Sequence, residues 1–359
     1  MSDDFHKKPF DQGTLTKLKL FELYTGEWLP VFLSRANSFC RAIHIFDFFA
    51  GPGSDLAGEP GSPIRILKTL TKFEALAGWS KVEKNLHFFD ESSSKIAVLS
   101  KKIDELGLKL PGITLDVRSA PFAQAFGECH GILRNPNAAK LVFIDQTGVS
   151  QVTPDVFRSL VNAPMCDFMF FVSSSTLHRF KEDPNIFQKI ETLEDHYQVH
   201  RAALRYYRGL LPAGKTYYLA PFSIKKGGNI YGVIFGSAHA LGIDKFLQVA
   251  WKNDELRGEA DFDIDRENLH PGDLQLPFRE TRASKITVFE ETLEALLRAG
   301  QIRNEGDVIQ VCFDHGVKRQ HAEELLRRLK TEGVIELSFR VPDIDRLAEP
   351  RPIRLKKKV

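Results

Sequence analysis

Several features that mark specialised protein classes are scarce or absent in this 359-residue sequence. Only four cysteines are present, and no two of them stand in the C-x-x-C spacing typical of zinc and redox sites. No run of about 18 apolar residues occurs, which is the length that a transmembrane helix needs. Met1 is not followed by an apolar stretch, so no signal peptide is expected. These absences predict a cytoplasmic protein with reduced thiols, no metal site and no membrane span.

A strong charge of one sign is also missing. The sequence has 49 Lys and Arg against 47 Asp and Glu, a formal net charge of +2. This balance gives no global sign of nucleic-acid binding, although it leaves room for a local basic surface. The hydrophobic fraction of 43% and the charged fraction of 27% are typical of folded globular chains. At about 150 residues per domain, the length predicts two or three domains.

The first two thirds of the chain alternate short apolar runs with helical stretches. A helix is expected over 14–33, and the apolar runs are rich in Val, Ile and Phe and too short for buried helices, which indicates strands. The expected strands are 43–49, 85–89, 113–115, 141–144 and 168–172, and the helices between them are 62–77, 93–106, 120–133 and 154–161. Such alternation predicts an α/β fold with a doubly wound, Rossmann-like parallel sheet. Strand-like runs at 216–222 and 231–236 predict that an antiparallel hairpin closes it.

The composition changes after residue 253. The segment 254–284 holds nine acidic and four basic residues, with Pro and Gly interruptions, and is expected to be an acidic linker. Three helices and a strand in 285–342 predict a small winged helix-turn-helix domain, followed by a basic tail over 343–359. The α/β domain then occupies 1–253.

The third helix expected in the winged-helix unit carries basic side chains that are candidates for contacts with nucleic-acid phosphates. These candidates are Lys318, Arg319, Arg327 and Arg328. Glu323 and Glu324 share the helix, and domains of this type also serve protein contacts. A solvated helix face is therefore the alternative interpretation.

A glycine-rich loop follows the first expected strand of the α/β domain, in the sequence Asp47-Phe48-Phe49-Ala50-Gly51-Pro52-Gly53. Such a turn lets the backbone approach a ligand closely and directs N–H groups toward it. The third Gly of the dinucleotide-binding pattern is missing. An ordinary tight turn between strand and helix explains the spacing equally well.

Three further acids, Asp90, Asp116 and Asp145, are expected to end the next three strands. Because the carboxyl ends of parallel strands meet at one edge of a sheet, these acids and Asp47 should lie together there. Helix capping or turn formation is the alternative for each Asp taken singly. Four strands in succession that end in Asp favour a ligand site, in which Asp90 would accept hydrogen bonds from a ribose diol.

The motif Asp47-x-Phe49-Ala50-Gly51-x-Gly53 resembles the cofactor loop of class I S-adenosylmethionine-dependent methyltransferases, in the form common among nucleic-acid enzymes. More narrowly, the whole chain resembles the three-Cys-motif partner (TcmP) family. The residues that carry this second resemblance are Thr16-Lys17-x-Lys19, Tyr24, Trp28, the glycine loop, Gly58-Glu59-x-Gly61-Ser62-Pro63, and Phe143-Ile144-Asp145 with Gly148.

The resemblance implies S-adenosylmethionine as cofactor and a role for each matching residue. The loop residues Asp47, Phe49, Ala50, Gly51 and Gly53 would hold the cofactor, chiefly its methionine moiety. Asp90 would bind the ribose hydroxyls, Asp116 the adenine amine, and Val117 would pack on the adenine ring. Asp145 and Gln146 would face the methyl group and the substrate as catalytic residues.

Two functions from different classes follow. The first is a methyltransferase acting on nucleic acid together with a separately encoded, radical-SAM-like partner that carries the three-Cys motif. The second is a non-catalytic nucleic-acid-binding or partner-recruiting protein on the same fold. The segment Asp145-Gln146-Thr147-Gly148 lacks the Asp-Pro-Pro pattern of amino-methylating DNA enzymes, which favours the second function. No Pro-Cys nucleophile follows the fourth strand, so covalent catalysis through Cys is not expected.

Overall fold

The computed structural model describes residues 9–35, 39–107, 112–145, 151–173, 199–226, 229–252 and 285–356. The segment 254–284, expected as an acidic linker, lies outside these residues, as do Gln146 and the last three residues of the chain. No described helix has the length and apolar character that crossing a membrane requires.

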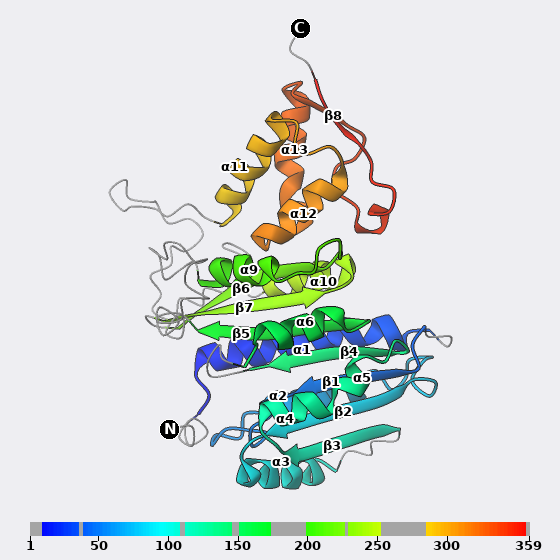
Figure 1. Cartoon of the computed structure of the whole chain (residues 1–359), viewed down its shortest axis with the longest axis vertical. Coiled ribbons are helices and arrows are strands. Elements are labelled where there is room, and N and C mark those ends of the chain that lie inside the picture. Colours follow the sequence, from blue (N-terminus) through cyan, green and yellow to red (C-terminus); the bar gives the residue numbers. More distant parts are fainter. Residues whose placement is uncertain are drawn as a thin grey trace.

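A seven-stranded mixed sheet forms the centre of the molecule (Figure 1). Its strands are β1 (Ala42–Asp47), β2 (Glu83–Asp90), β3 (Ile113–Ser119), β4 (Ala138–Ile144), β5 (Cys166–Ser173), β6 (Tyr218–Lys226) and β7 (Asn229–Ser237). They are ordered β3-β2-β1-β4-β5-β7-β6, with parallel pairing from β3 to β5 and antiparallel pairing of β7 with both neighbours. This confirms the doubly wound sheet and its closing hairpin. Strand order reverses between β1 and β4, the switch point at which such sheets bind ligands.

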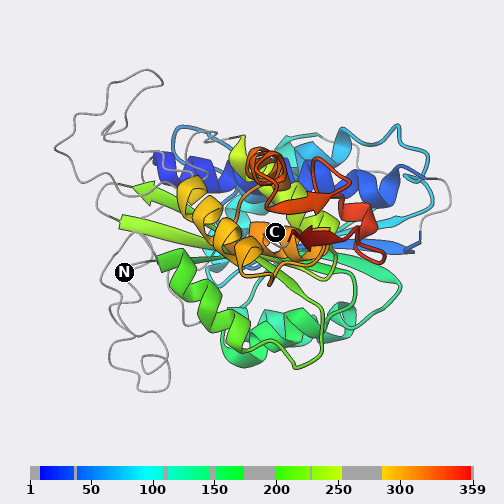
Figure 2. The ribbon, with the colours of Figure 1, turned by 90° about the horizontal axis from the view of Figure 1, so that it is seen from above.

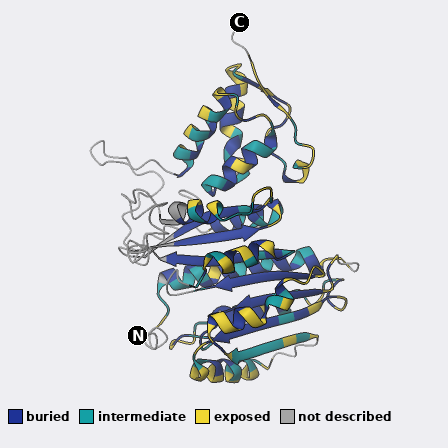
Figure 3. Ribbon diagram, viewed as in Figure 1, coloured by how far each residue is buried: buried dark blue, intermediate teal, exposed yellow. Residues whose placement is uncertain are grey.

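Helices cover both faces of the sheet (Figure 2). On one face lie α1 (Gln12–Leu33), α2 (Ser62–Thr71), α3 (Ser93–Glu105) and α10 (Ala240–Trp251). On the other lie α4 (Phe122–Glu128), α5 (His130–Leu133), α6 (Pro154–Asn162) and α9 (Val199–Gly209). Strands β1, β2 and β4 between the two layers are mostly buried, as parallel strands covered on both faces must be, whereas β3 at the edge is mostly half-buried (Figure 3).

Helix α1 packs on the sheet over β4 and β5 and is anchored there by aromatic side chains. It begins at Asp11, whose carboxylate accepts a hydrogen bond from the Thr14 N–H at 2.8 Å and so caps the first turn. The ring of Phe21 stacks on Phe143 of β4 at 4.1 Å between centroids. One turn further on, the Tyr24 hydroxyl donates to the Asp167 carboxylate of β5 at 2.7 Å.

The C-terminal unit consists of helices and a small antiparallel sheet. Its elements are α11 (Lys285–Arg298), α12 (Glu305–His315), the 3-10 turn η4 (Arg319–His321), α13 (Ala322–Thr331), β8 (Ile335–Leu337), the 3-10 turn η5 (Ile344–Arg346) and β9 (Ile353–Leu355). The third expected helix, which carries Lys318 and Arg319, thus begins as a 3-10 turn. The expected boundary of a basic tail at residue 343 is wrong, because β9 pairs with β8 and belongs to the unit.

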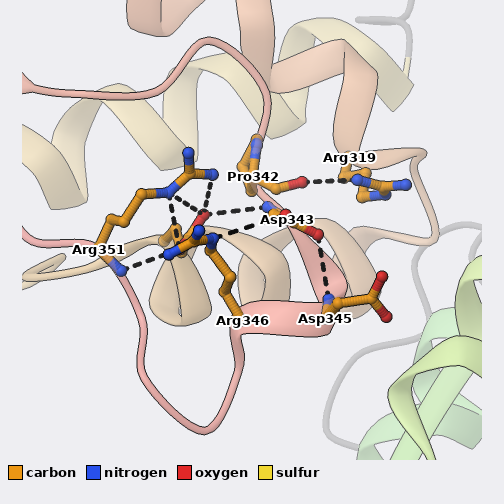
Figure 4. Close-up of polar contacts among 7 residues, drawn as sticks. Arg319, Pro342, Asp343, Asp345, Arg346 and Arg351 are labelled. Carbon is orange, nitrogen blue, oxygen red and sulfur yellow. Dashed lines mark hydrogen bonds and ion pairs between the residues drawn. The ribbon is translucent and has the colours of Figure 1, made fainter.

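A buried ion pair explains why this last segment folds back. The Glu305 side chain is fully buried at the start of α12. Its carboxylate accepts hydrogen bonds from the backbone N–H and the guanidinium of Arg351, with Nη2 at 2.7 Å, and from the Asp343 N–H at 3.0 Å (Figure 4). Burial acts to raise the pKa of Glu305, but the bonds from Arg351 outweigh it and hold the pKa below its ordinary value.

The C-terminal unit packs directly on the α/β domain beside β6 and α10 (Figure 1). The Trp251 indole N–H donates to the Gly316 carbonyl at 3.1 Å. Two ion pairs cross the same boundary, Arg208 with Asp314 at 2.5 Å and Arg319 with Asp244 at 3.0 Å. These contacts between described residues are enough to position the C-terminal unit on the α/β domain.

Breaking the buried ion pair should unfold the C-terminal unit at lower denaturant. We expect Arg351→Met to lower its free energy of unfolding by about 3 kcal/mol, because a buried carboxylate loses its counter-ion. A carboxylate with a lowered folded-state pKa stabilises above its unfolded pKa, and this stabilisation is lost as pH falls through the folded pKa. The difference from wild type should therefore shrink below about pH 4.5. Urea titrations at pH 3.5 and 7 measure it.

The matched control for this experiment is Arg354→Met, which removes an exposed base three residues further along the same segment. It should leave the midpoint nearly unchanged. A loss for Arg351→Met that is the same at both pH values would contradict the ionic explanation.

Candidate ligand site at the carboxyl edge of the sheet

Asp47 is the last residue of β1 and lies at the switch point of the sheet. Its side chain is fully buried, and Oδ1 accepts a hydrogen bond from the Phe49 N–H at 3.0 Å. Oδ2 has no hydrogen-bond partner within 3.5 Å among the described residues, and the nearby Ser62 side chain lowers the pKa of the carboxyl. Burial raises the pKa of Asp47 to about 7, against the lowering effect of its hydrogen bonding. A buried carboxylate oxygen without a donor is costly, which suits a site whose ligand supplies one.

The loop after Asp47 is tied to the neighbouring strand β2 by backbone hydrogen bonds. The Ala50 N–H donates to the Phe89 carbonyl at 2.8 Å, and the Gly51 N–H donates to Asp90 Oδ2 at 3.1 Å. Gly51 has φ +63° and Gly53 φ +81°, conformations that favour glycine. The structure therefore requires glycine at these two positions of the predicted motif.

The segment that connects Gly53 to the start of α2 is a closed loop. The Gly61 N–H donates to the Gly53 carbonyl at 2.8 Å and joins its two ends. Asp55 holds its interior, because Oδ1 accepts from the N–H groups of Ala57 and Glu59 at 2.9 and 2.8 Å. These bonds explain how the loop between Gly53 and Gly61 keeps the glycine turn in place.

Asp90 ends β2, as the sequence predicts, and its side chain is 7% exposed. Oδ1 accepts from the Ser92 N–H at 2.9 Å and lies 3.9 Å from the Lys95 ammonium. Electrostatic effects of both Asp90 and Asp145 contribute to the raised pKa of Asp47. The structure thus brings three of the four predicted acids together at this edge.

Asp145 follows β4 directly and forms an ion pair that the sequence does not reveal. The Lys17 ammonium of α1 lies 2.7 Å from each of its two carboxylate oxygens. Lys17 also lies over the ring of Phe171, 5.0 Å from the centroid. The only available signal was the spacing of Lys17, Phe21, Tyr24 and Trp28, which places them on one face of a helix.

The expectation that Asp116 ends the third strand is wrong. Asp116 lies inside β3, which continues to Ser119. Its carboxylate pairs with Arg118 at 3.0 Å and lies 3.5 Å from His87. Strands β2 and β3 pair Asp90 with Ser119, so Asp116 sits three residues short of the edge. The run of Asp-Val-Arg-Ser is polar enough to be mistaken for a strand end, but pairing with β2 extends the strand.

The other predicted site residues are placed as follows. Phe49 is half-buried, and its ring stacks on Phe122 at 5.6 Å between centroids. Val117 is half-buried and packs against the core on the α1 side of the sheet. Cys129 and Cys166 are buried, which raises their thiol pKa values to about 11 and about 12 and disfavours the thiolate.

The four basic residues expected at nucleic acid do not form one surface. Arg319 binds Asp244 and the Pro342 carbonyl, and Lys318 lies 5.6 Å from the Trp251 ring, so both stand where the C-terminal unit meets α10. Arg328 pairs with Glu294 at 2.6 Å. The Arg327 side chain is 70% exposed, and its ion pair with Glu324 is long, at 3.6 Å.

Comparisons with known proteins give structural likeness only. No protein-family model and no curated protein matches the sequence. Among solved structures, Trm1 from Pyrococcus horikoshii, solved with S-adenosyl-L-methionine, is 10% identical and covers 98% of this chain and 92% of its own, with a TM-score of 0.40.

Two shorter methyltransferases are also similar. An rRNA methylase from Streptococcus thermophilus is 9% identical over 64% of this chain and 98% of its own, with a TM-score of 0.32. The O-methyltransferase TomG from Streptomyces achromogenes, solved with SAM, is 15% identical over 62% of this chain and 78% of its own, with a TM-score of 0.35.

The raised pKa of Asp47 makes stability depend on pH. Its folded-state pKa of about 7 exceeds the ordinary value of 3.8, so ionisation disfavours the fold and stability falls as pH rises from about 4 to about 7. Asn cannot ionise. We therefore expect the free energy of unfolding of Asp47→Asn, relative to that of wild type, to increase over this interval by on the order of 4 kcal/mol. Chemical denaturation across the range measures it.

Asp155→Asn is the control, since its side chain is 95% exposed. It should follow the wild-type curve at every pH. Parallel curves for Asp47→Asn and wild type would show that Asp47 is ionised throughout.

Proposed function

We propose that this protein is an S-adenosylmethionine-dependent methyltransferase that acts on nucleic acid. The observation that carries the proposal is the buried, unpartnered Asp47 Oδ2 at the switch point of a doubly wound sheet. It lies beside a glycine loop tied to Asp90, with Asp145 at the end of the adjacent strand β4. A ligand with an ammonium group, a ribose diol and a positively charged centre matches this arrangement of acids.

The residues present fit the cofactor group by group. Asp47 Oδ2 would accept from the methionine ammonium, and the glycine loop would lie close to the methionine moiety. Asp90 would bind the ribose hydroxyls through the lone pairs left free by Gly51 and Ser92. Val117 remains the predicted contact of the adenine ring, whereas Asp116 is directed elsewhere by Arg118 and His87.

At the transfer end, the bound cofactor would supply an electrophilic methyl group. Asp145 would accept a hydrogen bond from the attacking group of the substrate and orient it, and would take the proton released. Gln146 stays a predicted partner in this role. The loop and the edge acids hold the reactants, so positioning is the main contribution of the protein.

The C-terminal unit supports a nucleic-acid substrate. The order of three helices followed by the antiparallel β8–β9 pair supports our proposal that this unit is a winged helix-turn-helix. On α13, Arg327 and Lys330 are exposed, and Arg354 and Lys356 of the last segment are exposed as well. These four, rather than Lys318 and Arg319, are the proposed phosphate contacts. A separately encoded three-Cys-motif partner stays part of this proposal.

One observation favours a non-catalytic alternative. Both oxygens of Asp145 already contact the Lys17 ammonium, so the acid at the transfer position is charge-compensated. A protein that binds the cofactor and nucleic acid but recruits a separate enzyme would retain such a pair. Binding of S-adenosylmethionine without methyl transfer to DNA or RNA would favour this function.

Isothermal titration with S-adenosylmethionine tests the cofactor assignment. Because the pKa of Asp47 is about 7, the carboxylate needed for the ammonium forms as pH rises through that value. We expect the affinity of wild type to increase roughly five- to tenfold from pH 6 to pH 7.5. Asp47→Asn should bind at least about tenfold more weakly at pH 7.5 and lose the pH dependence. Absence of binding at millimolar concentrations would overturn the proposal.

Charge reversal on α13 tests the nucleic-acid surface. Arg327→Glu and Lys330→Glu should each weaken binding to total tRNA or duplex DNA and reduce the salt slope of log Kd by about 1. Lys101→Glu on α3 is the control, because the Lys101 side chain is 79% exposed. Helix α3 packs beside β3, the edge strand farthest from the C-terminal unit. Equal affinities for all three variants would rule out this surface. Fluorescence anisotropy at several salt concentrations gives the slopes.

A further inference from the structure

One face of α1 carries a row of residues that pack on the sheet from its carboxyl edge downward. Phe21 contacts Phe143 and Phe171, with ring centroids 4.1 and 5.5 Å apart, and Tyr24 donates its hydroxyl to Asp167. Lys17 stands one turn before Phe21 on the same face. The packing of the aromatic residues therefore fixes where the lysine ammonium reaches the edge.

The contact that Lys17 makes there is close and two-pronged. Its Nζ lies 2.7 Å from both Oδ1 and Oδ2 of Asp145, while the two side chains are 17% and 27% exposed. An ammonium in this place holds the plane of the carboxylate. Each carboxylate oxygen keeps a further lone pair, so Asp145 can still accept a hydrogen bond from a ligand.

Anchoring the helix does not require this ion pair. Partly exposed ion pairs typically contribute only about 0–1 kcal/mol, whereas a buried aromatic side chain contributes more through its apolar area. Phe21 and Tyr24 are both 1% exposed and already bind α1 to the sheet. The role of the Lys17 ammonium therefore concerns the carboxyl edge of the sheet, where it contacts Asp145.

The charges at the edge are distributed unequally among its three carboxylates. Asp145 has the Lys17 ammonium at 2.7 Å, and Asp90 has the Lys95 ammonium at 3.9 Å. Asp47 has no ion pair among the described residues, and no donor there lies within hydrogen-bond distance of its Oδ2. Lys17 thus offsets the negative charge of Asp145 at the end of β4. No described cation does the same for Asp47.

We propose that Lys17 is a positioning residue that orients the Asp145 carboxylate for the acceptor group and offsets its attraction for the sulfonium of the cofactor. This inference rests on the proposed function. With the charge offset, the site holds the cationic cofactor mainly at Asp47. It then discriminates only weakly between S-adenosylmethionine and the neutral product S-adenosylhomocysteine, so the product can leave.

The ratio of the affinities for S-adenosylmethionine and S-adenosylhomocysteine is the direct test, measured by titration with these two compounds alone. Lys17→Met leaves Asp145 uncompensated and should raise the preference for the sulfonium compound by roughly three- to tenfold. Asp145→Asn should lower that preference below the wild-type value. A loss of local structure would instead weaken both compounds alike.

Three further variants complete the experiment. Lys19→Met, two residues along α1 at an exposed position, should leave the ratio unchanged. Lys17→Arg keeps the charge and should restore the wild-type ratio. In the double variant Lys17→Met/Asp145→Asn the ratio should return toward the wild-type value, because the carboxylate and the ammonium that offsets it are both removed.

The outcomes separate the two proposals. If wild type binds neither compound, the proposed function fails. If wild type binds both and the ratio is the same in Lys17→Met, Asp145→Asn and wild type, this inference fails while the cofactor assignment stands. An unchanged ratio in Lys17→Met with a lowered one in Asp145→Asn would also overturn the role of Lys17.

Discussion

The burial of the Asp47 carboxylate is the constraint on which the rest of the site depends. A carboxylate at the end of a central strand, enclosed by two layers of apolar side chains, has little access to water, and its pKa rises accordingly. The glycine loop supplies one donor, the Phe49 N–H, and leaves the second oxygen without one. The neighbouring acids Asp90 and Asp145 add to the cost of ionising Asp47, so a cationic ligand would lower that cost.

The attachment of the C-terminal unit to the α/β domain has a consequence for the proposed nucleic-acid interface. Trp251 and Arg319 bind the turn between α12 and α13 to the α/β domain. The turn, with its cations Lys318 and Arg319, therefore lies in the interface between the C-terminal unit and the α/β domain. What stays exposed is the outer side of α13 with Arg327, at a fixed position relative to the sheet. A substrate held there would meet the α/β domain in a defined orientation.

Part of the site follows from local sequence. A run of apolar residues that ends in Asp and is followed by Gly-Pro-Gly predicts both the strand and the turn, because glycine tolerates φ +63° and +81° at Gly51 and Gly53. Asp90 and Asp145 were placed for the same reason, since an Asp after a buried run ends a strand. Asp116 failed this reasoning because pairing between β2 and β3 extends the third strand to Ser119. That pairing depends on contacts between distant segments.

The sequence by itself determined the α/β class, the closing hairpin and the glycine loop, because periodicity and backbone conformation are local properties. Only the tertiary structure decided that Lys17 reaches Asp145, 128 residues away, since helix packing on the sheet brings them together. It also decided that Arg351 folds back onto Glu305 and turns an expected tail into a strand. In each case a charge found its counter-ion across the chain, and charge pairing at long range leaves no periodic pattern to read.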